Sequence, residues 1–79
     1  MRLDEIREIV VQHARLSAKA EDIGPTTDLY SVGLSSLTTV HLMLALEDHF
    51  SVEFPNHLLS RKTFESLQSI AEAIAELTS

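Results

Sequence analysis

The chain has 79 residues, no cysteine, and six Lys or Arg against twelve Asp or Glu, which gives a formal net charge of −6. The lack of cysteine excludes disulfides and zinc–thiolate sites. The acidic balance argues against nucleic acid as a partner, because phosphate binding needs Lys and Arg, and it favours positively charged proteins instead.

A chain of this length predicts a single domain over residues 1–79. A domain this small buries only about 60% of the surface that its unfolded chain exposes, so a deep active site is hard to build. We therefore expect a binding or carrier role and no enzymatic activity. The acidic start lacks the apolar segment of a signal peptide, and no apolar run approaches the ~18 residues of a membrane span. We expect a cytoplasmic monomer without a membrane span.

The first predicted helix runs from Asp4 to Leu16, where apolar residues recur at helical spacing and carboxylates lie in the first turn. Residues 18–35 lack a clean period and hold several turn-forming residues, which predicts a long loop. Such a loop needs a function or packing of its own. Ile23 and Leu29 are expected to pin it to the helices, while Tyr30 has an alternative place beside Ser36.

The second predicted helix, Ser36 to Phe50, carries two apolar stripes. One stripe holds Leu42, Met43, Leu46 and Phe50, and the other holds Leu37, Val40 and Leu44. A helix in a small bundle needs one apolar face about 100° wide, so this helix has more than its core requires. We expect at least part of the second stripe to be exposed, with burial in the core as the alternative.

The rest of the chain predicts a short turn and a last helix. Phe54-Pro55 disfavours helix at residues 53–54, and Asn56 can cap a turn over residues 57–59. The last helix, from Thr63 or Ser66 to Leu77, has an apolar stripe and outward carboxylates: Leu67, Ile70, Ile74 and Leu77 inside, and Glu65, Glu72 and Glu76 outside. The elements together predict an all-α fold, a small four-helix bundle with a long loop between its first two helices.

Two adjacent hydroxyls, Ser35 and Ser36, stand at the start of the second helix after Gly33. Helix capping explains a serine here, because serine oxygens commonly accept a bond from a free backbone N–H. Nucleophilic catalysis would need a base in reach of Ser36, but His41 lies roughly 100° or more around the helix. The four histidines, which also include His13, His49 and His57, are not spaced as metal ligands. We therefore expect neither a catalytic nor a metal site.

The stretch from Asp28 to Val40, with residues 42–50 and the Phe54-Pro55 pair, resembles the acyl carrier proteins. In that family a Gly-x-Asp-Ser-Leu motif carries a covalent 4'-phosphopantetheine arm on its serine. The resemblance implies a four-helix bundle of acyl-carrier type, with the arm on Ser36 and Ser35 in the place of the aspartate. It implies three kinds of partner: a phosphopantetheinyl transferase, a loading ligase that activates amino acids or acyl groups, and downstream transferases.

By position, Leu37, Val40 and Leu44 match the partner-docking residues of that family. The carrier would hold an acyl or aminoacyl group as a thioester and present it to enzymes that dock there. The alternative, from a different class of function, is an unmodified helical module that binds a partner through this apolar face of the second helix.

The charges of the second helix differ from the usual pattern of the family. Thr38 and His41 stand where acidic residues are common, and Glu47 and Asp48 remain as the acidic pair of its second half. Charge complementarity governs partner choice and association rate, so the usual fatty-acid enzymes are not the expected partners. The pattern is similar to stand-alone bacterial carriers loaded by ligases related to class II aminoacyl-tRNA synthetases, which favours aminoacyl over fatty-acyl cargo.

Overall fold

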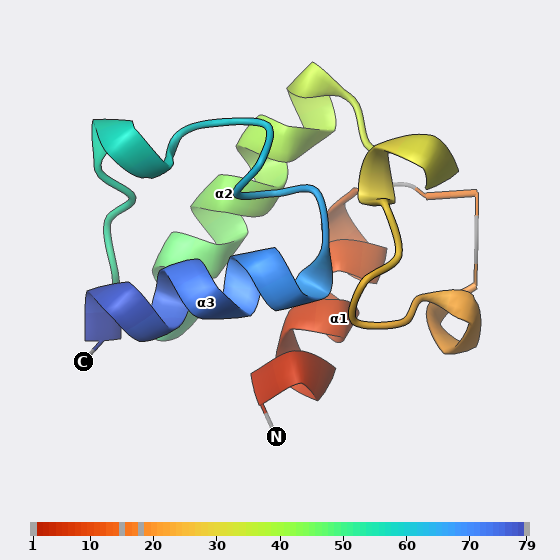
Figure 1. Ribbon diagram of the computed structural model, residues 1–79, viewed down its shortest axis with the longest axis horizontal. Coiled ribbons are helices and arrows are strands. Elements are labelled where there is room, and N and C mark those ends of the chain that lie inside the picture. Colours follow the sequence, from red (N-terminus) through yellow and green to blue (C-terminus); the bar gives the residue numbers. More distant parts are fainter. Residues whose placement is uncertain (1, 15, 18, 79) are drawn as a thin grey trace.

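The computed structural model describes residues 2–14, 16–17 and 19–78, which form three α-helices, three 3₁₀ helices and no β-strand. Residues 15 and 18, part of the predicted first helix and loop, lie outside the described residues. The α-helices are α1 (Arg2–His13), α2 (Ser36–Phe50) and α3 (Leu67–Thr78), and the 3₁₀ helices are η1 (Ala20–Asp22), η2 (Leu29–Val32) and η3 (Asn56–Leu58). Along the long axis, η2 lies toward one end, and η3 and the C-terminus lie toward the other (Figure 1).

One apolar core joins the three α-helices, with α1 in contact with both α2 and α3. The side chains of the three α-helices that have no exposed surface are Ile6, Val10, Leu42, Leu46, Leu67, Ile70 and Ile74. Ile23 and Leu29 of the α1–α2 loop are also buried, at 1% and 0% exposure, which confirms that they pin the loop. This packing gives a segment with little regular structure a defined path.

The four-helix count of the predicted bundle is not confirmed, since the described residues form three α-helices and η3 is a three-residue 3₁₀ turn. Asn56 lies inside that turn, and the preceding cap position belongs to Pro55. Downstream, the backbone continues in turns closed by Thr63 N–H to Ser60 O and Phe64 N–H to Arg61 O. The Ser60 and Thr63 hydroxyls also lie 3.3 Å apart, and such local bonds compete with a continuous helix.

The other helix boundaries follow the prediction closely, and α2 has the predicted ends. α1 ends at His13 rather than Leu16, but Leu16 still packs partly buried against the core. α3 begins at Leu67, after Ser66, whose hydroxyl accepts a bond from the Ser69 N–H at 3.1 Å. No helix among the described residues is both long enough and apolar enough to cross a bilayer.

A reciprocal pair of hydrogen bonds sets the start of α2. The Ser35 hydroxyl accepts from the Thr38 N–H at 3.2 Å, and the Thr38 hydroxyl accepts from the Ser35 N–H at 2.9 Å. This capping box satisfies two backbone donors at once. Just before it, Gly33 adopts a left-handed φ of 118°, a conformation that glycine enters without strain from a β-carbon.

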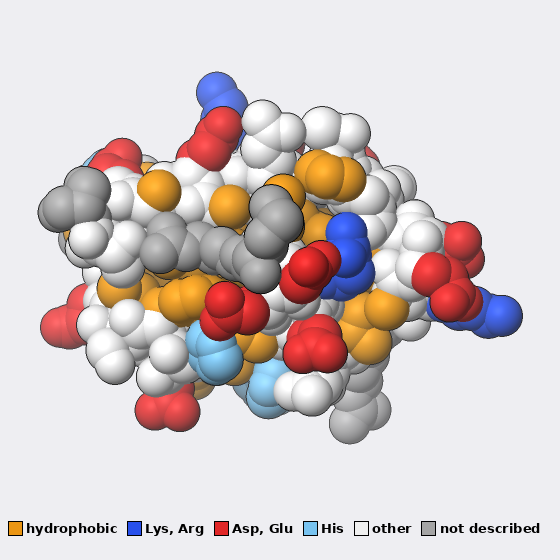
Figure 2. All heavy atoms as spheres, turned by 90° about the horizontal axis from the view of Figure 1, so that it is seen from below, with side chains coloured by type: hydrophobic (Ala, Val, Ile, Leu, Met, Phe, Trp, Pro, Cys, Tyr) orange, Lys and Arg blue, Asp and Glu red, His pale blue; other side chains and the backbone are white. Residues whose placement is uncertain are grey.

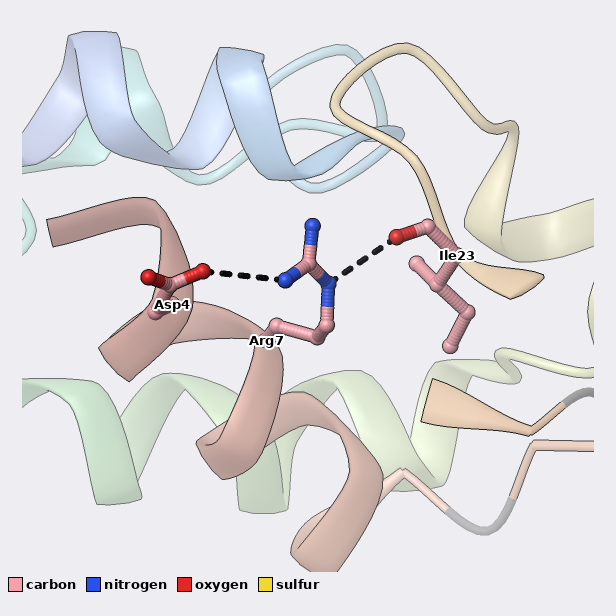
Figure 3. Close-up of polar contacts among 3 residues, drawn as sticks. All are labelled: Asp4, Arg7 and Ile23. Atoms are coloured by element: carbon pink, nitrogen blue, oxygen red, sulfur yellow. Dashed lines mark hydrogen bonds and ion pairs between the residues drawn. The ribbon is translucent and has the colours of Figure 1, made fainter. Parts of the chain in front are cut away.

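Arg7 ties the α1–α2 loop to the first helix. Its Nε donates to the Ile23 carbonyl oxygen at 3.0 Å, and its Nη1 lies 3.0 Å from Asp4 Oδ1 (Figure 3). The Arg7 side chain is 28% exposed and that of Asp4 is 70% exposed. The carbonyl bond is therefore the better sheltered of the two contacts.

We expect Arg7→Gln to lower the free energy of unfolding by about 1–2 kcal/mol, because it removes a charged donor from a partly buried carbonyl. Asp4→Asn removes only the exposed ion pair and should change stability by less than about 0.5 kcal/mol. Urea unfolding of both variants measures the difference. Equal effects would contradict the proposed tie between Arg7 and the loop.

The capping box predicts different stability effects for the two adjacent serines. Ser35→Ala should lower the free energy of unfolding by about 1 kcal/mol, since it leaves the Thr38 N–H without its side-chain acceptor. Ser36→Ala should change the free energy of unfolding by less than about 0.5 kcal/mol, as expected for an exposed side chain without a specific contact. A larger loss for Ser36→Ala in the same urea titration would show that the cap is misassigned.

Candidate functional site

Ser36 is the first residue of α2, and its side chain is exposed. The side-chain hydrogen bonds at this helix start belong to Ser35, Thr38 and Thr39. Within the described part of the chain, the Ser36 hydroxyl takes part in none of them. The structure thus assigns capping to the first serine and leaves the second available for chemistry.

An open groove of about 410 Å³ begins at Ser36. It lies between α2, η2 and the segment that leads from η3 to α3, and it is lined by Tyr30, Ser36, Thr39, Val40, Met43, Leu59, Ser60, Arg61 and Phe64. Tyr30 therefore shares a groove with Ser36, which confirms the alternative placement. Among the residues that the structure describes, the lining contains no carboxylate and no histidine, and Arg61 is its only charged member.

The second apolar stripe of α2 is exposed, as expected. Leu37 is 67% exposed, Leu44 is 54% exposed and Val40 is 49% exposed, whereas Leu42 and Leu46 of the other stripe are buried. The helix thus turns one apolar face to the core and keeps another, next to Ser36, in solvent. His41 and Asp48 are exposed on α2 as well.

Glu47 has an internal contact that the sequence did not indicate. Its Oε2 accepts the Phe54 N–H at 2.8 Å, and its side chain is half-buried. The Glu47 carbonyl also accepts from Val52 N–H, where Ser51 turns the chain with a φ of 55°. Glu47 therefore holds the chain that follows α2, and its carboxylate is less available to a partner than that of Asp48.

Two histidines form contacts with carboxylates across the fold. His49 Nε2 lies 3.0 Å from Glu5 Oε2, and His57 Nε2 lies 3.0 Å from Glu76 Oε2. All four histidines are exposed, and no group of three described side chains could hold a metal ion. Acidic side chains are scattered over the face seen in Figure 2, with histidines beside some of them.

Sequence reasoning missed Arg61, Leu59 and Phe64 as groove residues. They lie far from Ser36 along the chain and share no motif with it, so only the tertiary fold brings them together. Thr38 stands where the family commonly has an acidic residue, and its part in the capping box was not predicted from the sequence. A hydroxyl residue three positions after the cap was the available local signal.

Comparison with known proteins shows the family of the chain. The family described as "Phosphopantetheine attachment site" matches residues 4–74. An aminoacyl carrier protein of Agrobacterium fabrum is 42% identical over 69 residues, which cover 87% of this chain and 83% of that protein.

Two solved structures have the same fold. One is the carrier protein from Agrobacterium tumefaciens complexed with an engineered Bradyrhizobium japonicum glycine:[carrier protein] ligase and ATP. It matches with a TM-score of 0.89 and 38% identity over 95% of this chain and 99% of that one. The other, the glycylated carrier protein complexed with the Bradyrhizobium japonicum ligase, matches with a TM-score of 0.72 and 28% identity over 90% and 96% of the two chains. The chain therefore belongs to the phosphopantetheine-attachment family, and within it to the aminoacyl carrier proteins.

Proposed function

We propose that the chain carries an aminoacyl group on a 4'-phosphopantetheine arm attached to Ser36 and presents it to partner enzymes. This proposal rests on one observation, which is that two adjacent serines have different roles in a chain of a family with a phosphopantetheine attachment site. Ser35 is committed to the capping box, while Ser36 is exposed and its hydroxyl has no bond to a described residue. Ser36 also stands in the motif position that carries the arm in acyl carrier proteins.

The residues around Ser36 fit the group. Attachment would place a phosphate at the N-terminus of α2, where backbone N–H groups and the helix dipole favour negative charge. The arm supplies a thiol for the thioester, in a chain that has no cysteine of its own. The groove beside Ser36 offers apolar side chains along which an attached arm can lie.

In this proposal, the chain performs no catalysis. A serine nucleophile needs a base within hydrogen-bond reach, and no histidine or carboxylate in the described part of the chain lines the groove at Ser36. A phosphopantetheinyl transferase attaches the arm, a ligase loads it, and downstream transferases unload it. The protein itself acts as a cytoplasmic monomer in this account.

We place partner docking on the exposed stripe of α2, formed by Leu37, Val40 and Leu44. Exposed apolar side chains beside the attachment serine give a partner a surface to bury. His41 and Asp48 would set the charge at its edge, and Glu47 would contribute less because it bonds the Phe54 N–H.

An amino-acid-activating ligase is the loading enzyme that we favour. The similar carrier proteins are complexed with glycine:[carrier protein] ligases, one of them in glycylated form. The neutral residues Thr38 and His41 also leave the docking helix less acidic than the usual fatty-acid carriers, which disfavours enzymes that read acidic charges. An unmodified interaction module would not account for membership of a phosphopantetheine-attachment family.

The attachment site is tested by intact mass after co-expression with a promiscuous phosphopantetheinyl transferase. Wild type should gain the mass of one arm, Ser36→Ala should gain none, and Ser35→Ala should keep at least part of the gain. Loss of the gain in Ser35→Ala with retention in Ser36→Ala would overturn the assignment.

The docking surface is tested by loading. Val40→Glu should lower the rate of aminoacylation by an amino-acid-activating ligase at least ~10-fold, because a charge would have to be buried in the contact. It should lower stability by less than about 1 kcal/mol, since Val40 is half exposed. Val11→Glu, an exposed apolar position on α1, is the matched control and should load normally.

Unfolding of the domain by Val40→Glu would show that Val40 supports the core and does not serve docking. Efficient acylation of the wild-type holo protein by a fatty-acyl loading enzyme, with no aminoacyl product from any ligase tried, would contradict the proposed cargo.

A further inference from the structure

Arg61 holds an unusual place in this acidic chain. Of the described side chains that line the groove at Ser36, Arg61 alone is charged, and none is a carboxylate. The contacts between basic side chains and carboxylates among the described residues involve Arg7, His49 and His57, so Arg61 has no carboxylate partner there. A cation without an anionic partner thus lies in the groove that begins at the attachment serine.

Arg61 does have an aromatic partner. Its guanidinium carbon lies 4.0 Å from the centroid of the Tyr30 ring, within the range of a cation–π contact. Stacking of this kind limits the conformations of a long side chain, which lowers the entropy cost of binding a ligand. It also leaves the N–H groups at the edge of the guanidinium free to form paired bonds to phosphate oxygens.

The fold holds the Tyr30 ring close to the segment that carries Arg61. Asp28 Oδ1 accepts from the Tyr30 N–H at 3.0 Å at the start of η2. The Leu29 N–H donates to the Glu65 carbonyl at 2.8 Å, which links η2 to the chain just before α3. A backbone hydrogen bond therefore links η2, on one side of the groove, to the segment before α3 on the other side.

We propose that Arg61, stacked on Tyr30, binds the phosphodiester of the arm on Ser36 and directs the arm into the groove. This inference rests on the proposed attachment at Ser36. A phosphodiester is anionic, and the net charge of −6 opposes it, whereas the N-terminus of α2 and a nearby cation favour it. Arg61 supplies that cation, and Tyr30 acts as a positioning residue that keeps the guanidinium over the groove.

The contact keeps the unengaged arm against the body of the protein, next to the exposed stripe of α2. Val40 belongs to both surfaces, since it lines the groove and is 49% exposed. A partner that docks on this stripe therefore meets the start of the arm at the same place. Release of the phosphodiester from Arg61 would free the arm to enter the partner.

Nuclear magnetic resonance of matched apo and holo proteins tests the proposal. In wild type, attachment of the arm should shift the Arg61 Nε–H resonance and the methyl resonances of Val40 and Leu59. The ³¹P resonance of the arm should differ between wild type and Arg61→Gln. The methyl shifts should be lost in Arg61→Gln and retained in Lys62→Gln, which removes the same charge from an exposed neighbour outside the groove lining.

Tyr30 provides a second pair of variants. Tyr30→Phe keeps the ring and should keep the shifts, whereas Tyr30→Leu should reduce them, and circular dichroism checks that both remain folded. Raising the salt concentration from about 50 mM to about 1 M should also reduce the wild-type shifts, because an exposed charge contact is screened.

The outcomes separate the two proposals. A wild-type protein that gains no mass with the transferase would refute attachment itself. A protein that gains the arm on Ser36, but shows the same methyl shifts and the same ³¹P resonance in Arg61→Gln, would refute the role of Arg61 alone.

Discussion

The capping box between Ser35 and Thr38 is the contact on which the rest of the site depends. It fixes the residue at which α2 begins, and so it fixes which serine stands exposed at the first helical position. A start one residue later would give the cap to Ser36 and remove its hydroxyl from chemistry. The same bonds orient the exposed stripe of α2, because the position of every later side chain around the helix follows from its first turn.

The second requirement is a loop that returns to this helix start along one path. Ile23 and Leu29 bury their side chains in the core, and Arg7 bonds the Ile23 carbonyl. Leu29 also bonds the chain before α3 through its N–H. These contacts bring Tyr30 to one wall of the groove and the segment of Arg61 to the other. A long connection between two helices becomes part of the site in this way, as is common for loops that carry function.

The sequence predicted the features that depend on local periodicity. α2 has the expected ends, and the exposure of Leu37, Val40 and Leu44 follows from a helix with two apolar stripes and one core to cover. The four-helix count is not confirmed, because the predicted short turn after Phe54-Pro55 is a three-residue 3₁₀ turn and adds no α-helix. The hydroxyls of Ser60 and Thr63 offer this segment local hydrogen bonds that compete with a helix. The spacing of apolar residues does not reveal such competition.

Contacts between distant segments could not be predicted in the same way. Arg61 and Tyr30 come into contact only when the loop packs against the segment before α3. No sequence motif contains both residues, so their contact could not be predicted from the sequence. The internal bond of Glu47 likewise depends on the turn at Ser51, whose backbone is left-handed. Family resemblance predicted Ser36 as the attachment residue, but the groove that would hold its arm required the tertiary structure.

The most direct test of this account is to locate the arm in the unmutated protein. Peptides of the holo protein that span residues 28–40 contain Ser31, Ser35 and Ser36, and fragmentation by tandem mass spectrometry distinguishes them. The account predicts one arm, on Ser36, with unmodified Ser35. An arm on Ser35 would contradict it, because the residue that caps α2 would then also carry the group.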